Sequence, residues 1–293
     1  MKTITKDQIS EIGTDKSSFR QVCRENGKKQ LVTGPVSSLR FGRCLEINLL
    51  PFKMCTFNCI YCELGQTPLK TIECKKLISP DRIITELKTK LPTKPDYITI
   101  SGSGEPTLYL EMRELIERIR MLTDIPVAVI TNGSLLWNKE VRKSLSNAQL
   151  VAASLDSASD LMFQTINRPH TDISFDQLIK GLTSFRHEYS GKYWLEIMLI
   201  AGYTAIPSEI SKLSALIKKI RPDKVQLNTI TAPPAENYAQ SVDKKRLHEL
   251  AALFDPRAEV IADFDRTNNI PKYGINNNVV INPEMKGDHY ARI

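Results

Sequence analysis

The sequence lacks the long apolar segments that would place a chain in a membrane. No run approaches the ~18 consecutive apolar residues of a membrane-spanning helix. The opening residues, MKTITKDQIS, have no apolar core of the kind that a signal peptide needs. Solenoid-length repeats and low-complexity tracts do not stand out either. We therefore expect a cytoplasmic globular protein with no membrane partner.

Cysteine and histidine are scarce, with six and four residues among 293. In a reducing cytoplasm, clustered cysteines are typical of metal binding or catalysis rather than of disulfides. Hydrophobic residues make up 41% and charged residues 25% of the chain, which excludes a disordered or fibrous protein. The net charge of +7 favours an anionic partner such as RNA, a phosphorylated substrate or an acidic protein.

Short apolar runs alternate with amphipathic segments. We expect strands at 44–52, 96–101, 126–133, 150–157, 193–202, 223–230 and 258–263. We expect helices between them at 79–91, 110–122, 138–145, 174–189, 207–220 and 244–254. This alternation predicts an α/β fold with a parallel sheet and crossover helices.

About six strand–helix units suit a partial or full (β/α) barrel, and a doubly wound open sheet is the competing architecture. We expect the barrel to span residues 40–266, between an N-terminal extension at 1–39 and a polar C-terminal tail at 267–293.

The stretch KMCTFNCIYCELG holds half of the cysteines, Cys55, Cys59 and Cys62, in the spacing CxxxCxxC. The stretch follows the first predicted strand, at the end of the sheet where parallel α/β folds build active sites. Three thiolates leave one iron of a four-iron cubane without a protein ligand, and an open position is what a catalytic metal needs. A structural zinc with a distant histidine folded back, or three unliganded core cysteines, are the alternatives.

This cysteine motif, with Tyr61 directly before its last cysteine, resembles the signature of the radical S-adenosylmethionine (SAM) superfamily. The resemblance extends roughly from Arg40 to Phe254 and implies a full or partial (β/α) barrel. It implies a 4Fe–4S cluster on the three cysteines, with SAM chelating the open iron. One electron would then split SAM into methionine and a 5′-deoxyadenosyl radical, which abstracts a hydrogen atom from the substrate.

Three further elements follow in the order that the resemblance implies. The turn after the second predicted strand is similar to the superfamily's glycine–glycine–glutamate element, with serine at the central position: Gly102, Ser103, Gly104 and Glu105. Glycines allow close backbone approach to a ligand, and a carboxylate can accept hydrogen bonds from SAM's ammonium group. Polar residues at the next two strand ends match places where relatives hold SAM: Asn132, Ser154 and Asp156. An ordinary turn or helix cap would also use these residue types.

Substrate contacts are expected from three other residues. Arg168, in the segment INRPH beside His170, can hold a carboxylate or phosphate as a planar fork. Glu196 lies inside an apolar strand, where an unpaired buried charge is costly. Asn228, on the sixth strand, can contact adenine or substrate. Arg40, Arg43 and Lys53 near the cysteine motif can contact SAM, an anionic substrate or only water.

The remaining cysteines, Cys23, Cys44 and Cys74, are scattered, so we expect isolated thiols rather than a second cluster. The segment 34–67 most resembles small Fe–S oxidoreductases related to the enzymes that build the wyosine base of tRNA. This relationship implies a tRNA base or a partner protein as substrate and flavodoxin or ferredoxin as electron donor. A zinc-stabilised RNA-binding protein and an Fe–S electron carrier are the alternative functions.

Overall fold

The computed structural model describes residues 30–267. The predicted C-terminal tail after Thr267 lies outside the described residues, as do Cys23 and most of the predicted N-terminal extension. The proposed domain boundaries therefore stay predictions.

One eight-stranded sheet runs through the described chain in the order β1-β2-β5-β6-β7-β8-β9-β10. Every neighbouring pair is parallel except β1 and β2. Its strands are β1 (Val32–Ser38), β2 (Gly42–Asn48), β5 (Tyr97–Ser101), β6 (Val127–Thr131), β7 (Leu150–Ser154), β8 (Lys192–Leu199), β9 (Lys224–Thr229) and β10 (Glu259–Val260). A separate parallel pair consists of β3 (Met54–Cys55) and β4 (Leu69–Lys70).

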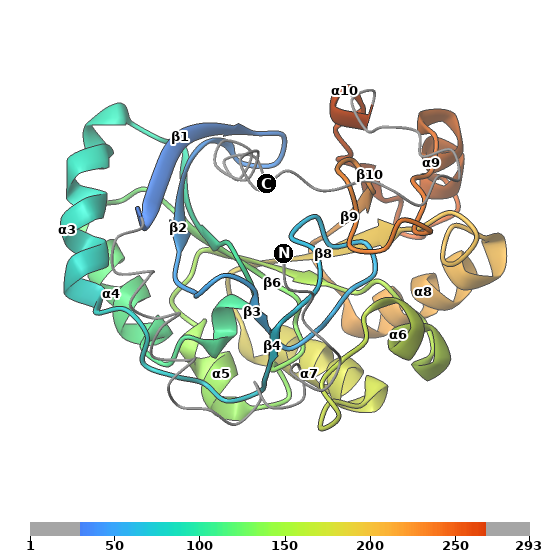
Figure 1. Cartoon of the computed structure of the whole chain (residues 1–293), viewed down its shortest axis with the longest axis horizontal. Helices are drawn as coiled ribbons and strands as arrows, with labels where there is room; N and C mark the ends of the chain where they lie inside the picture. Colours follow the sequence, from blue (N-terminus) through green and yellow to red (C-terminus); the bar gives the residue numbers. More distant parts are fainter. Residues whose placement is uncertain (1–29, 268–293) are drawn as a thin grey trace, which may run out of the picture.

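Helices lie around the outer side of the curved sheet (Figure 1). The α-helices are α3 (Pro80–Lys90), α4 (Met112–Leu122), α5 (Lys139–Ser144), α6 (Asp160–Ile166), α7 (Phe175–Glu188), α8 (Pro207–Ile220), α9 (Lys244–Ala251) and α10 (Phe264–Thr267). Two short 3-10 helices are η1 (Leu91–Thr93) and η2 (Pro106–Leu108).

The strands follow one another across the sheet in chain order without a reversal. A doubly wound sheet would need a point where the strand order reverses and helices on both faces. The partial-barrel prediction is therefore confirmed, and the doubly wound alternative is wrong.

Capping explains why several helices begin where the sequence predicts. The Ser79 side chain accepts a hydrogen bond from the Asp81 amide, and Pro80 occupies the first turn of α3. Ser174 and Gln177 form a reciprocal capping box at the start of α7. The predicted helix at 207–220 coincides with α8.

The strand β1 and the helix α6 are among the elements that the sequence analysis does not predict. The strand β1 pairs antiparallel with β2 and forms the edge of the sheet, although glycine and proline interrupt its sequence. The helix α6 has only seven residues, too few for a clear apolar period. The edge position of β1 tolerates Pro35 because a proline at a sheet edge need not donate a hydrogen bond.

Strand β8 shows how the sheet separates its two faces. Tyr193, Leu195 and Ile197 are buried, whereas the alternate positions Trp194 and Glu196 are only half-buried. Successive side chains of a strand point to opposite faces, so Glu196 lies on the opposite face from the apolar core. The charged position in this apolar strand is thereby placed inside the curve of the sheet.

Phe41 closes the amino-terminal end of the curved sheet. The β1–β2 turn places its ring against Trp194 at 5.7 Å and against Tyr97 at 5.4 Å between ring centroids. Tyr97 begins β5 and Trp194 lies near the start of β8, so this apolar contact lies at the end opposite the strand carboxyl ends.

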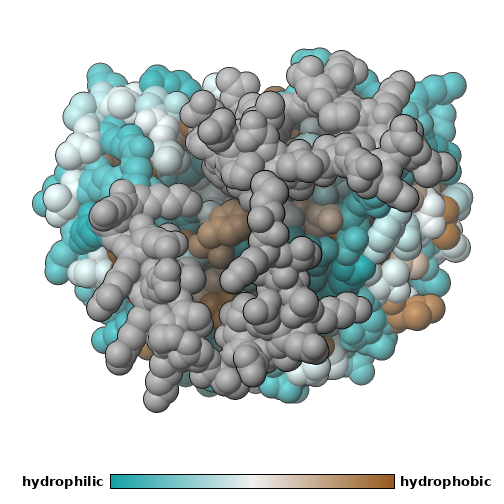
Figure 2. All heavy atoms as spheres, viewed as in Figure 1, coloured by the Kyte–Doolittle hydropathy of each residue, from teal (hydrophilic) through white to brown (hydrophobic). Residues whose placement is uncertain are grey.

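No helix among residues 30–267 is long and apolar enough to cross a membrane. Around the rim of the face in Figure 2 most of the visible surface is hydrophilic, and hydrophobic residues are visible nearer its centre. A polar outer surface is expected where helices cover a sheet and meet water on their far side.

Leu195 and Leu161 form a matched pair that tests this packing. Leu195→Ala should lower the free energy of unfolding by about 2–5 kcal/mol, because Leu195 is fully buried and its removal leaves a cavity. Leu161 is 77% exposed, so Leu161→Ala should change the free energy of unfolding by less than about 0.5 kcal/mol. Urea unfolding followed by circular dichroism measures both, and equal losses would contradict the placement of β8.

Candidate functional site

The strand that begins the cysteine motif lies directly against the turn that follows β5. Met54 in β3 bridges to Gly104, and the Glu105 amide donates to the Met54 carbonyl at 3.0 Å. A Cβ atom on Gly104 would lie 1.9 Å from that carbonyl oxygen, so no other residue fits without moving the strand. The predicted glycine turn thus positions the cysteine motif at the carboxyl ends of the strands.

Ser103 stands where the resemblance implies glycine, and it is buried. Its hydroxyl accepts a hydrogen bond from the Asn48 side-chain amide at 2.7 Å, and its own amide donates to Asn48 at 3.2 Å. Gly102, with a φ of 109°, packs its backbone against the same asparagine. The serine therefore ties the turn to the end of β2.

Glu105 is buried at the end of the turn and accepts four hydrogen bonds. They come from the Thr107 amide and hydroxyl, the Thr131 hydroxyl and the Asn132 amide. Burial raises the pKa of Glu105, and these hydrogen bonds oppose the rise. The carboxylate therefore joins the ends of β5 and β6 beneath the cysteine motif.

Cys55 ends β3, Cys59 and Cys62 lie in the loop that follows, and all three are half-buried. The side-chain amides of Asn132 and Asn167 donate to the sulfurs of Cys55 and Cys59, each at 3.7 Å. Burial raises the pKa of Cys55 to about 12, with the Glu105 charge adding to the effect. The pKa of Cys59 is well above its usual value, because of burial and then the neighbouring thiols. Metal binding must therefore displace these protons.

The three cysteines remain the proposed ligands of a multi-iron cluster. Within residues 30–267, no three histidine, cysteine, aspartate or glutamate side chains are placed to share one metal ion. A cubane binds each thiolate through a different iron, so its ligands need not converge on one point. The amide donors on the sulfurs are also what Fe–S sites use to adjust their electronic properties. The zinc alternative gains no histidine, because His170 joins no such group.

Tyr61 anchors the far side of the loop. Its hydroxyl donates to Asp156 at 2.5 Å, and Asn167 donates to the same carboxylate oxygen at 2.8 Å. The Met198 amide donates to the other oxygen at 3.0 Å. Burial, followed by the Asp156 charge, raises the pKa of Tyr61 well above its usual value. Asp156, expected to contact SAM, thus already holds the loop to β8.

Ser154 ends β7 and lies beside Glu196 of β8 in the sheet register. It is half-buried, on the inner face of the sheet. Asn132 directly follows β6, and its side chain donates to the Thr56 hydroxyl at 2.7 Å. Both predicted residues therefore lie at strand ends, and their contact with SAM stays a prediction.

Glu196 and Asn228 come together on the inner face of the sheet. Arg40, from the β1–β2 turn, donates to Glu196 at 2.6 Å, and Asn228 donates to the other carboxylate oxygen at 3.0 Å. The side chains of Arg40 and Glu196 are only 6% and 15% exposed. A buried carboxylate needs such a partner, so the charge that the sequence left unexplained is paired.

Arg168 lies away from this pair, on the outside of the cysteine loop. It donates to Glu236 at 2.5 Å and to the Tyr238 hydroxyl at 2.6 Å. Gln66, just after the loop, donates to the same glutamate at 2.8 Å. Arg168 also has a φ of 48°, an uncommon backbone conformation for a residue other than glycine. Arg168 therefore has other hydrogen-bond partners than Glu196 and Asn228.

The other thiols are apart from the motif. Cys44 is buried in β2, and the Cys74 sulfur donates to the Thr107 carbonyl at 3.4 Å. With Cys23 outside the described residues, the expectation of isolated thiols stays a prediction.

Asn167, Thr56, Asn48 and Glu236 belong to the site but were not identified from the sequence. Asn167 lies next to Arg168, which drew attention because of its charge. Asn48 ends a strand, a signal that could have singled it out in the way that Asn132 was singled out. Glu236 lies in an irregular loop and gives no local signal.

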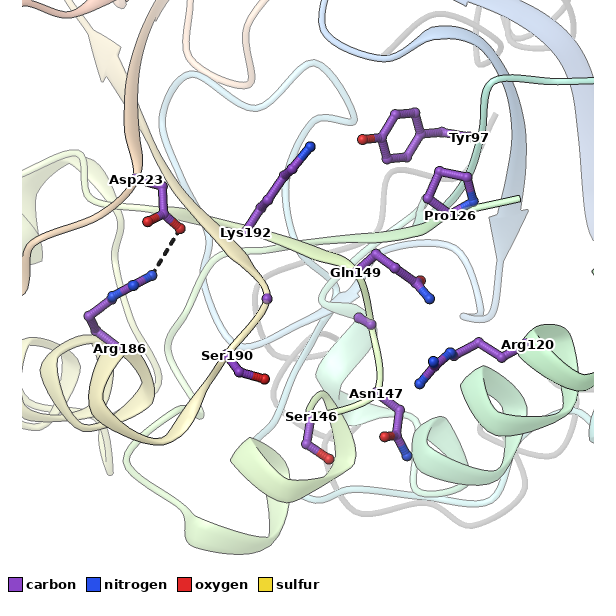
Figure 3. Close-up of a pocket in the computed structure, with 12 residues that line it drawn as sticks. Tyr97, Arg120, Pro126, Ser146, Asn147, Gln149, Arg186, Ser190, Lys192 and Asp223 are labelled. Carbon is purple, nitrogen blue, oxygen red and sulfur yellow. Dashed lines mark hydrogen bonds and ion pairs between the residues drawn. The ribbon is translucent and has the colours of Figure 1, made fainter. Parts of the chain in front are cut away.

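A cavity of about 720 Å³ lies at the opposite end of the strands (Figure 3). It is lined by residues at the beginnings of β5 to β9, including Tyr97, Gln149 and Lys192. An ion pair between Arg186 and Asp223, 2.9 Å long, borders it. None of the predicted site residues lines this cavity, so the cysteine site is separate from it.

A comparison with protein-family models identifies the superfamily. The model of the radical SAM superfamily matches residues 49–213. A protein named GTPase Obg from Brachyspira hyodysenteriae is 39% identical over 238 residues, which is 80% of this chain but 35% of that protein. The chain thus spans about a third of this relative's length. A UPF0026 protein of Methanocaldococcus jannaschii is 35% identical over 226 residues, 76% of this chain and 70% of that one.

The fold also resembles solved structures. Streptococcus suis SuiB bound to S-adenosylmethionine superposes with a TM-score of 0.57 at 14% identity, covering 90% of this chain and 57% of that one. At this identity the likeness concerns the fold alone.

The hydrogen bond between Tyr61 and Asp156 can be tested by removing one hydroxyl. Tyr61→Phe should lower the free energy of unfolding by about 1–3 kcal/mol, because a buried carboxylate loses a partner. Tyr203→Phe is the control, since no described residue bonds to its hydroxyl, and it should cost less than about 0.5 kcal/mol. Urea unfolding compares the two, and an equal effect would show that the Tyr61 hydroxyl does not hold the loop.

Proposed function

Because the chain belongs to the radical SAM superfamily, we propose that Cys55, Cys59 and Cys62 are the ligands of its 4Fe–4S cluster. Enzymes of this superfamily use such a cluster together with SAM, and this chain is such an enzyme. The observation that carries the assignment of the ligands is the placement of the three cysteines at the carboxyl ends of the strands, beside the Gly102–Glu105 turn.

When bound, the cluster and SAM supply the one-electron cleavage that yields methionine and a hydrogen-abstracting 5′-deoxyadenosyl radical. The residues of this chain hold and shield that chemistry. Asn132 and Asn167 donate amide hydrogens to two sulfurs, which stabilises their thiolate form. Tyr61 and Asp156 fix the end of the loop. Glu105 orients the strand ends below it. Because its carboxylate already accepts four hydrogen bonds, the backbone carbonyls of the same turn are the proposed acceptors for SAM's ammonium group.

The substrate is proposed to enter from the carboxyl ends of the strands and to reach the inner face of the sheet. Glu196 and Asn228 lie there, joined to Arg40, and Ser154 lies beside them. We propose Glu196 and Asn228 as substrate contacts, and Ser154 keeps its proposed role in binding SAM. Arg168 suits a different role, because its guanidinium is already bound to Glu236 and Tyr238. It would position the cysteine loop rather than bind substrate.

We propose a tRNA base as the substrate and flavodoxin or ferredoxin as the electron donor. The net charge of +7 supports an anionic macromolecule, and the segment 34–67 resembles enzymes related to wyosine synthesis. A partner protein is the alternative substrate.

The cluster assignment predicts that a single cysteine substitution abolishes both the cluster and SAM cleavage. The anaerobically reconstituted protein should contain about four irons per chain and cleave SAM to methionine and 5′-deoxyadenosine under dithionite. Cys59→Ala should lose both the cluster and the cleavage. Iron and sulfide analysis and chromatography of the products measure this.

Cys74→Ser is the matched control, because serine keeps a donor for the Thr107 carbonyl, and it should retain cluster and cleavage. An active cluster in Cys59→Ala would refute the assignment. Zinc without sulfide in the unaltered protein would instead favour a metal-stabilised RNA-binding protein. A reducible cluster that neither binds nor cleaves SAM would favour an electron carrier.

The substrate proposal predicts a change in cellular tRNA. A strain that lacks the protein should lose a modified nucleoside, and expression of the unaltered chain, but not Cys59→Ala, should restore it. Mass spectrometry of tRNA nucleosides makes the comparison. An unchanged profile would remove tRNA and leave a partner protein as the substrate to test.

A further inference from the structure

Lys53 combines two unfavourable features two residues before Cys55. Its side chain is only 2% exposed, although lysine is almost never fully buried unless its charge is paired. Its backbone φ is 51°, a left-handed conformation that is uncommon for residues with a side chain. Such costs persist where the surrounding structure imposes them, and they gather at functional sites.

The surroundings of Lys53 hold it beneath the cysteine loop. Its backbone amide donates to the Ser103 carbonyl at 2.6 Å, which ties it to the glycine turn. Its ammonium group donates to the carbonyl of Gly65. Gly65 in turn donates its amide to the Cys62 carbonyl at 3.1 Å, so the lysine side chain spans the loop from its first residues to its last.

No carboxylate among the described residues forms an ion pair with Lys53. The nearby Glu105 is occupied by Thr107, Thr131 and Asn132. A single carbonyl dipole does not balance a full buried charge, which is expensive in a region of low dielectric constant. Within residues 30–267, Lys53 therefore has no carboxylate counter-charge. Burial raises the pKa of the Cys55 thiol, and the Lys53 charge opposes this rise.

A four-iron cluster with three thiolate ligands supplies the missing negative charge. In its oxidised form the four irons and four sulfides carry two positive charges, and the three thiolates make the whole negative. One electron from a low-potential donor reduces the cluster and makes it more negative by one unit. A nearby buried cation stabilises the reduced form more than the oxidised form, because the attraction grows with the negative charge.

We propose that the Lys53 ammonium is the built-in counter-charge of the cluster and raises its reduction potential. This inference rests on the proposed function, and it makes Lys53 a positioning residue for charge rather than a ligand. A higher reduction potential favours the reduction of the cluster that precedes SAM cleavage. The competing view is that the lysine methylenes merely fill space beneath the loop.

The test compares full-length reconstituted proteins in which only the charge changes. Lys53→Met keeps an unbranched apolar side chain and removes the ammonium group. At a fixed solution potential it should contain about tenfold less reduced cluster relative to oxidised cluster, which corresponds to about 59 mV for one electron. Lys53→Arg keeps the charge and should stay close to the unaltered protein. Redox titration followed by electron paramagnetic resonance measures each ratio without relying on activity.

Lys70→Met is the matched control. Lys70 lies on β4 beside the same loop, but it is exposed and donates to the Pro169 carbonyl. Water and salt screen an exposed charge, so this variant should titrate like the unaltered protein. The effect of Lys53→Met should also persist at high salt, because a buried charge is screened much less.

The remaining outcomes either support or overturn the proposed role of Lys53. Unchanged ratios in Lys53→Met, an equal shift in Lys53→Arg, or an equal shift in Lys70→Met would overturn the proposal. If Lys53→Met folds by circular dichroism but loses its cluster, retention of the cluster in Lys53→Arg supports the need for charge. Loss in both shows a packing role and overturns it. Absence of iron and sulfide from the unaltered protein refutes the proposed function itself, before any variant is titrated.

Discussion

A contact between two backbones determines where the cysteine loop lies. Gly104 approaches the Met54 carbonyl so closely that a Cβ atom would lie 1.9 Å from it. Cys55, the first cysteine of the motif, is the last residue of this strand, so its position is set by β3. The cysteine loop then lies at a fixed position, and the carboxyl ends of the parallel strands place polar groups around it. The rest of the site depends on this contact, because the other hydrogen bonds to the cysteine loop require the loop to lie at the strand ends.

Side-chain hydrogen bonds and an ion pair hold the remainder of the loop. Tyr61 reaches Asp156 at the end of β7, and Asn167 joins both to the Cys59 sulfur. On the outer side, Arg168 and Glu236 connect the loop to a later segment. A sheet that forms only a partial barrel gives its loops fewer neighbours than a closed one. These interactions supply the missing support, and the buried Asp156 carboxylate would be costly without its partners.

Two opposing effects act on the protonation of the ionisable residues in this site. Burial raises the pKa of Cys55, Cys59 and Asp156, which disfavours their charged forms. A bound cluster needs thiolates, and the surrounding amides and the buried Lys53 favour them. A site of this kind is stable in its charged form when the metal is present, which couples metal binding to the protonation of the loop.

Most of the fold could be predicted from local patterns. The serine caps of α3 and α7, and the apolar strands β6 and β8, reflect interactions within a few residues. The strand β1 was missed, because its irregular sequence becomes a strand only by pairing with β2. Within the site, the motif of Cys55, Cys59 and Cys62 and the Gly102–Glu105 turn are contiguous, so their spacing alone identified them.

The chain by itself determined which residue types are close along the sequence, and hence the alternation of strands and helices and the cysteine spacing. Only the tertiary structure decided which distant polar groups meet. Arg40 is 156 positions from Glu196, and Tyr61 is 95 positions from Asp156. Several arginines and asparagines could satisfy a buried carboxylate equally well in chemical terms. The partner is chosen by the register and curvature of the sheet, which arise from the packing of the whole core.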